Sequence, residues 1–281
     1  MFSGNNASGN TTKMRYVTIA SDGDTVDFGD MTFSYRYGMV TGSKTRAMPM
    51  GGYSGSGYYD TINVVTMATT GDAQDFGDYH TANVAITNGL SSPTRGVFSG
   101  GYISPASTNE ISYVTISTLG DTQDFGDLTI TSHHGTGLSN ATRGIITAME
   151  NSSWTNNNSN RIDFITIAST GNATDFGDFN QSPYFGGTGF ASATRGLFAG
   201  GYNPTAGITD IGFFTFSSNG GANDFGNLNV ATLRDGGKVC NSTRGIWAGG
   251  QVIPSTSPGT VNIIQFVTMA TTGDASNFGD L

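Results

Sequence analysis

The chain has 281 residues, of which 42 are glycine and only 12% are charged, and its formal net charge is −9. Soluble domains average about 25% charged residues and about 7% glycine, so long amphipathic helices rich in Glu and Lys are not expected. The many Phe and Tyr residues exclude a disordered chain, and the excess of acidic over basic residues excludes a nucleic-acid-binding surface. No apolar run is long enough to span a membrane. With a single cysteine, the chain cannot form an internal disulfide.

Along the chain, the string Asp-Phe-Gly-Asp or a close variant recurs every 48 to 53 residues, and a Thr-Arg pair keeps the same step. Such a period indicates repeated supersecondary units. The repeated residues are Asp27, Phe28, Asp75, Phe76, Asp124, Phe125, Asp175, Phe176, Asp224, Phe225 and Phe278, together with Arg46, Arg95, Arg143, Arg195 and Arg244.

Each repeat predicts four short strands in a fixed order. In the third full repeat a Gly-rich strand runs from Gly135 to Leu138, an apolar strand follows Arg143, a β-branched and aromatic strand covers 164–168, and a fourth contains Phe176. Gly, Asn, Ser and Asp separate them, as antiparallel hairpins require. Four antiparallel strands in 40 to 50 residues are typical of a β-propeller blade.

The sequence therefore predicts an all-β, six-bladed propeller of four-stranded blades, forming a single domain over 1–281. The repeats cover approximately 1–30, 31–78, 79–127, 128–178, 179–227 and 228–281. Residues 1–4 align with 97–100, inside a second strand, so the first blade lacks its inner strand. We expect that strand to come from a longer parent chain or from a partner, which includes a second copy.

Two resemblances bear on identity. Gly-Gly-Tyr after the second strand and an aromatic residue on the fourth resemble kelch repeats, with Phe where kelch has Trp. Strings such as Tyr113-Val-Thr-Ile-Ser, Asp124-Phe-Gly-Asp-Leu and Ala141-Thr-Arg-Gly are similar to repetitive proteins of marine bacteriophages, especially cyanophages. This likeness implies a virion structural or tail-fibre-like protein on the extracellular particle, with other virion proteins as partners.

The repeated residues have predicted structural roles. We expect each Phe to pack between blades, its Gly to permit close approach or a bulge, and each Arg to form a bidentate pair with a repeated Asp. Calcium is the open alternative for the Asp-rich segments 71–78 and 120–127, although the EF-hand pattern is absent. No other metal and no cofactor is predicted, and Cys240 is interpreted as a small packed residue.

Binding is predicted on one face of the propeller. The loops between second and third strands vary most in length, and they share a face with the loops that join successive repeats; we name it the variable face, and the opposite one the constant face. Its aromatic residues and histidines suit sugar or protein contacts, although some of them are interpreted as rim residues that cover the core. They are Tyr35, Tyr37, Tyr53, Tyr58, Tyr59, Tyr79, His80, Tyr102, His133, His134, Trp154, Tyr184 and Tyr202.

The function predicted from these patterns is a non-enzymatic phage structural or adhesion protein that binds host-surface glycan or another virion protein. A carbohydrate-active enzyme or lyase on a propeller is one alternative, and a cluster of acids or histidines at the axial end of the variable face would favour it. A cellular kelch-like protein-interaction domain is the other alternative, because fold alone does not decide function.

Overall fold

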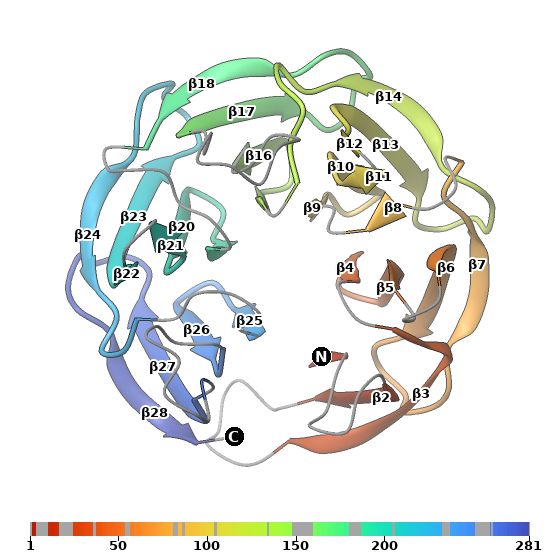
Figure 1. Ribbon diagram of the computed structural model, residues 1–281, viewed down its shortest axis with the longest axis horizontal. Helices are drawn as coiled ribbons and strands as arrows, with labels where there is room; N and C mark the ends of the chain where they lie inside the picture. The colour runs from red at the N-terminus through yellow and green to blue at the C-terminus, as the bar shows by residue number, and fades with distance from the viewer. Residues whose placement is uncertain are drawn as a thin grey trace.

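The protein is an all-β ring of antiparallel sheets (Figure 1). The computed structural model describes residues 2–3, 11–16, 25–35, 38–53, 57–80, 84–85, 88–103, 106–133, 135–147, 160–179, 187–203, 206–231, 237–250, 259 and 261–280. None of these residues forms a helix, so none of them provides a helix able to cross a membrane.

Five four-stranded blades follow one another around a central axis, each with its strands in chain order from the axis outward (Figure 1). Blade I consists of β4 (Met39–Gly42), β5 (Arg46–Tyr53), β6 (Tyr58–Thr66) and β7 (Gln74–Asp78), and blade II of β9 (Asn88–Ser91), β10 (Arg95–Ser99), β13 (Glu110–Thr115) and β14 (Gln123–Asp127). Blade III consists of β15 (Thr136–Ser139), β16 (Arg143–Thr147), β17 (Arg161–Thr166) and β18 (Thr174–Asp178), and blade IV of β19 (Thr188–Ala191), β20 (Arg195–Ala199), β23 (Asp210–Thr215) and β24 (Asn223–Asn227). Blade V consists of β25 (Gly237–Cys240), β26 (Arg244–Ala248), β27 (Ile263–Thr268) and β28 (Ser276–Asp280).

The remaining strands form three smaller sheets. The first repeat gives a three-stranded sheet, and two short sheets lie on the variable face. These strands are β1 (Phe2–Ser3), β2 (Thr11–Tyr16) and β3 (Val26–Tyr35); β8 (Val84–Ala85), β11 (Tyr102–Ile103) and β12 (Ala106–Ser107); and β21 (Tyr202–Asn203) with β22 (Ala206–Gly207).

The blade count corrects the sequence prediction. Six blades were expected, but the structure has five four-stranded blades, and the first repeat contributes only a three-stranded sheet. In that sheet β1 pairs with β2, and β2 pairs with β3.

The repeated Phe packs between neighbouring blades, which confirms its predicted role. In blade II, Phe125 is only 2% exposed and belongs to a buried hydrophobic cluster that includes Ile165 and Ile167 of blade III. Its backbone forms a β-bulge, because Ile111 pairs with Gly126 while the next residue, Ser112, pairs with Asp124. The extra residue turns the aromatic ring out of the blade and toward its neighbour.

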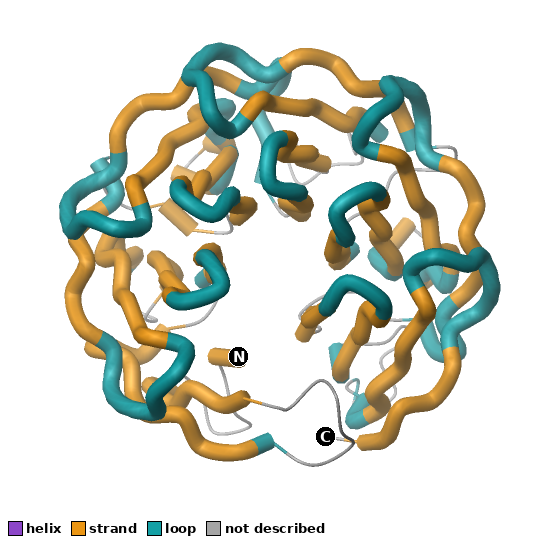
Figure 2. The backbone as a smooth tube through the Cα atoms, turned by 180° about the vertical axis from the view of Figure 1, so that it is seen from behind, coloured by secondary structure: helices purple, strands orange, loops and turns teal. Residues whose placement is uncertain are grey.

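The Gly after this Phe lets the outer strand touch the next blade. Gly126 has φ +143°, and a Cβ added there would lie 2.6 Å from the carbonyl carbon and oxygen of Gly171. Two backbone bonds cross the junction, from Gly171 N–H to the Phe125 carbonyl and from Ala173 N–H to the Asp127 carbonyl, both at 2.7 Å. Equivalent pairs join blade III to blade IV and blade IV to blade V, so main-chain bonds link the outer strands of successive blades. Figure 2 shows the ring of strands and loops in which these junctions lie.

Acidic and amide side chains in the loops between third and fourth strands add a bond to this junction. The Asp72 carboxylate accepts from the Asp30 N–H, and the Asp121 carboxylate accepts from the Asp78 N–H, both at 2.9 Å. Asn172 does the same for Asp127 at 3.1 Å. Asp72, Asp121 and Asn172 therefore each link their blade to the preceding sheet.

The repeated Arg does not pair with the repeated Asp, so that prediction was wrong. Arg95 donates from its guanidinium to the Ile167 carbonyl of blade III at 2.9 Å and lies 4.5 Å from the centre of the Tyr113 ring. The third strand of each blade separates the second strand from the fourth, and its aromatic ring covers the guanidinium. The repeated Asp has a local task instead: Asp175 accepts from the N–H of Gly177 at 2.9 Å.

Candidate binding surface on the variable face

Three predicted tyrosines gather on the variable face. Tyr53 and Tyr58 are partners at the end of the long β5–β6 hairpin, and their ring centres are 5.0 Å apart. The short sheet β8–β11–β12 contacts this hairpin through β8, and its β11 contributes Tyr102. All three side chains are half-buried, and together they form the tyrosine cluster (Tyr53, Tyr58 and Tyr102).

The phenol groups of this cluster share one environment. Burial raises the pKa of Tyr58, and the neighbouring Tyr102 and Tyr53 hydroxyls raise it further. The Tyr58 phenol is therefore neutral at physiological pH, and a phenol hydroxyl can donate as well as accept hydrogen bonds. Half-buried rings with hydroxyl groups close together present an apolar surface with polar edges, which is the chemistry that binds sugar rings and polar protein surfaces.

His133 supports the cluster rather than forming its surface, contrary to its prediction as a contact residue. Its side chain is fully buried, its Nδ1 lies 2.6 Å from the Ser107 Oγ, and its ring centre is 5.6 Å from that of Tyr102. Burial lowers the pKa of His133 to about 4. The imidazole is therefore neutral at pH 7, and it holds β12 and Tyr102 in place.

Two other predicted tyrosines pack between sheets. Tyr79 is 2% exposed and packs edge-on against Phe98 of blade II, and burial raises its pKa above the usual phenol range. Tyr59 packs on Phe33, with ring centres 4.3 Å apart. Both fit the alternative interpretation as rim residues that cover the core, since Tyr79 follows β7 and packs on blade II, while Tyr59 lies in β6 and packs on Phe33 of β3.

His80 is an exposed histidine on the variable face. Its Nε2 lies 2.9 Å from the Glu110 carboxylate, and its Nδ1 lies 2.9 Å from the Thr122 hydroxyl. Ser112 donates to the same carboxylate at 2.8 Å. His80, Thr122, Glu110 and Ser112 thus form a polar cluster between blades I and II, and their hydrogen-bond donors and acceptors are paired with one another.

The side chains of six predicted contact residues are not described by the structure. Four are beyond the described residues altogether, and two have a described backbone but no described side chain. They are Tyr37, His134, Trp154 and Tyr184, and then Tyr35 and Tyr202.

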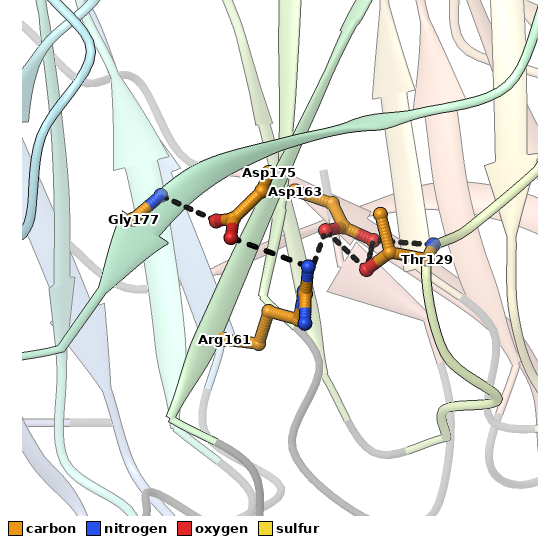
Figure 3. Close-up of polar contacts among 5 residues, drawn as sticks. All are labelled: Thr129, Arg161, Asp163, Asp175 and Gly177. Atoms are coloured by element: carbon orange, nitrogen blue, oxygen red, sulfur yellow. Dashed lines mark hydrogen bonds and ion pairs between the residues drawn. The ribbon is translucent and has the colours of Figure 1, made fainter.

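Sequence reasoning missed a buried polar cluster between blades II and III (Figure 3). Asp163, which is fully buried, accepts from the Thr129 N–H at 2.9 Å and from its hydroxyl at 2.7 Å. Arg161 places Nε 3.5 Å from Asp163 and an NH2 nitrogen 3.2 Å from Asp175. The carboxylates of this cluster therefore bond to protein groups, and the cluster fixes the junction of two blades.

The signal for this cluster was a break in the apolar pattern of the third strand. The residue before the aromatic position is buried and polar in four blades, and each reaches the previous sheet or an adjacent side chain. These residues are Asn63, Ser112, Asp163 and Gln265.

Metal ligands are not grouped in the part of the chain that the structure describes: no three His, Cys, Asp or Glu residues there could share an ion. Cys240 is half-buried, its thiol lies 3.4 Å from the Ala191 carbonyl, and burial raises its pKa. The thiol packs against blade IV, as the interpretation of Cys240 as a small packed residue requires.

Comparison with known proteins adds no family to this description. The sequence matches none of the protein-family models and none of the curated proteins with which it was compared. The fold established by the structure is a β-propeller, and the kelch and cyanophage resemblances continue to rest on the motifs alone.

Proposed function

We propose that this chain is a non-enzymatic adhesion propeller of a phage particle, which binds neutral host-surface glycan through the tyrosine cluster. The observation that carries the binding part is the convergence of Tyr53, Tyr58 and Tyr102 from two blades. The phage part rests on the sequence resemblance.

The chemistry of the cluster favours a sugar ligand. Tyrosine has only two side-chain torsions, so a ring that is already half-buried loses little conformational entropy when a ligand covers it. Stacking between the apolar face of a sugar and a phenol ring requires no charge, and the phenol hydroxyls supply hydrogen bonds to sugar hydroxyls. Support from the buried His133 ring keeps Tyr102 oriented before binding.

Binding is tested on an array of neutral and acidic oligosaccharides, followed by affinity measurements on the best neutral ligand. Replacement of Tyr58 by Ala should weaken that affinity by about tenfold or more, the usual cost of removing a central aromatic contact. Tyr58→Phe should retain part of the affinity, because the ring remains. Leu119→Ala is the matched control, since Leu119 is a 66% exposed apolar side chain on the constant face.

Two results would overturn the glycan proposal: no neutral oligosaccharide bound anywhere on the array, or a bound one whose affinity is unchanged by Tyr58→Ala. A virion protein captured through the same tyrosines in place of a glycan would also replace it. The particle location has a separate test. Peptides of this chain should be recovered from purified virions in constant ratio to the capsid protein, and their absence would remove the location without affecting the glycan result.

A further inference from the structure

One side chain of blade I breaks the pattern by which the blades cover their repeated Arg. The residue of the third strand that pairs with the first residue of the fourth strand is aromatic in blades II to V. These aromatic residues are Tyr113, Phe164, Phe213 and Phe266. Blade I has Val64 at this position, paired with Gln74. The third strand of blade I therefore provides no ring at the place where the other four blades have one.

The aromatic ring has a constant setting in the other blades. The centre of each guanidinium lies 4.5 to 5.3 Å from the centre of the ring in its own blade. In blade II, the Tyr113 ring also meets Phe125 edge-on, with ring centres 5.9 Å apart. The Tyr113 hydroxyl donates to the Gln123 Oε1 at 2.7 Å. The Tyr113 ring is therefore held between a guanidinium and the amide of its cross-strand partner.

Blade I has a cavity at the corresponding place on the constant face. The cavity has a volume of about 290 Å³, and its lining includes Arg46, Val64 and Gln74, together with the loop residue Asp72. Arg46 and Gln74 are the counterparts of the two residues that hold the Tyr113 ring in blade II. Because valine is much smaller than tyrosine, Val64 leaves this space between them.

The lining of the cavity suits a neutral aromatic ring with a hydroxyl group. Arg46 donates to the Ile116 carbonyl of blade II at 2.7 Å, and this bond fixes the guanidinium before a ligand binds. A guanidinium attracts the electron-rich face of an aromatic ring. The exposed Gln74 amide offers an acceptor for a hydroxyl, as Gln123 does in blade II. The Asp72 carboxylate carries the charge opposite to that of Arg46, so the lining has no net charge that would favour an ionic ligand.

We propose that the cavity formed by Arg46, Val64 and Gln74 binds a phenol ring from outside the chain. The ring stacks on the Arg46 guanidinium, and its hydroxyl donates to the Gln74 amide oxygen, as Tyr113 does within blade II. The phenol comes either from a free small aromatic compound or from an exposed tyrosine of a protein partner. This site lies on the constant face, so it does not depend on glycan binding by the tyrosine cluster of the variable face.

The side-chain signals of arginine report directly on this binding. In protein labelled with ¹⁵N-arginine, a ring stacked on Arg46 shifts its Nε–H signal through the ring current. We expect a saturable shift with phenol and none with cyclohexanol, which has a similar size but no aromatic face. The Arg143 signal should not move, because Phe164 already lies 5.3 Å from that guanidinium.

A capped Gly-Tyr-Gly peptide, titrated in parallel, distinguishes the two sources of the phenol. Tighter binding of the peptide than of phenol indicates a tyrosine of a protein partner. Equal or weaker binding of the peptide indicates a free aromatic compound.

Three variants make the test specific. Val64→Tyr supplies the ring that blade II carries, so it should fold, shift the Arg46 signal without a ligand and abolish phenol binding. Gln74→Met removes the acceptor at similar length and should weaken phenol binding by about three- to tenfold, the size of one hydrogen bond. Gln123→Met makes the same change in blade II, where Tyr113 already occupies the place, and is the matched control that should leave phenol binding unchanged.

The proposal is overturned by an Arg46 signal that does not saturate with phenol, by an equal shift with cyclohexanol, or by phenol binding that survives Val64→Tyr. A Val64→Tyr chain that fails to fold would also overturn it, because the cavity would then be too small for the ring. Equal losses in Gln74→Met and Gln123→Met would contradict the assigned hydrogen bond. Tyr58→Ala should leave the phenol titration unchanged, so failure of this site and failure of the glycan proposal are distinguishable.

Discussion

Alanine at Gly126 should cost much more stability than alanine at Gly120, although both lie in blade II. The two glycines have nearly equal backbone angles, φ +143° and φ +145°. Non-glycine residues pay about 1–3 kcal/mol for such a conformation, and this cost is common to both variants. A Cβ at Gly120 meets no described atom within 4 Å, whereas at Gly126 it meets the Gly171 carbonyl at 2.6 Å.

The difference between the two variants measures the blade junction. Displacing the Gly171 backbone adds an overpacking cost of about 1–3 kcal/mol. It also weakens the two main-chain bonds that Phe125 and Asp127 accept from blade III, each worth about 1 kcal/mol. We expect Gly126→Ala to unfold with a free energy about 2–4 kcal/mol lower than Gly120→Ala.

Equilibrium unfolding in urea, followed by tryptophan fluorescence and by far-ultraviolet circular dichroism, supplies the two free energies. In a thermal scan the same difference corresponds to a melting temperature lower by roughly 4–8 °C, at about 2 °C per kcal/mol for a chain of this size. Equal losses in the two variants would show that the outer rim does not hold the blades together, and the inferred role of the Phe-Gly bulge would then be wrong.

Three further predictions concern single side chains. Arg143→Met removes a 2.6 Å bond to the Phe216 carbonyl and a stacked contact, and should cost about 2–3 kcal/mol in denaturant unfolding, with partial recovery in Arg143→Lys; unchanged stability would contradict it. Because the folded-state pKa of His133 lies near 4, below its ordinary 6.5, stability should fall between pH 6.5 and 4 by at most about 3 kcal/mol, and His133→Gln should flatten that slope. The lowered pKa of Lys238 means that the unfolded chain holds more protons between pH 8 and 10.5, so stability should rise with pH through that window, and Lys238→Gly should flatten that rise.

Only part of the candidate binding surface could be predicted from the sequence. Tyr53 and Tyr58 could be placed on a common face because Gly-Gly-Tyr ends a second strand and the next loop is short. Tyr102, from the following repeat, lies near them because of the small sheet β8–β11–β12, and no periodic pattern in the sequence predicts that sheet. Burial of Tyr79 and His133 was equally hidden, because loop position does not show which side chains the neighbouring blade covers.

The contact between Lys238 and Thr136 could not be predicted from the sequence for a different reason. Thr136 lies 102 residues away along the chain, and blade IV lies between the two inner strands in the ring. A single lysine in a Gly-rich inner strand appears as an irregularity of one repeat. Only the curvature of the ring brings residues of non-neighbouring strands within hydrogen-bond distance.

The sequence by itself determined the all-β class, the repeat length and the place of the Phe between blades, because short-range alternation and a constant period specify each local unit. Tertiary structure decided how many four-stranded blades form, and it decided the partners of the long polar side chains. Arg95 could reach either an acid or a carbonyl by length alone, and the aromatic third strand between it and Asp124 selects the carbonyl of the next blade. Partner choice depends on which groups the neighbouring blade presents, and no single repeat contains that information.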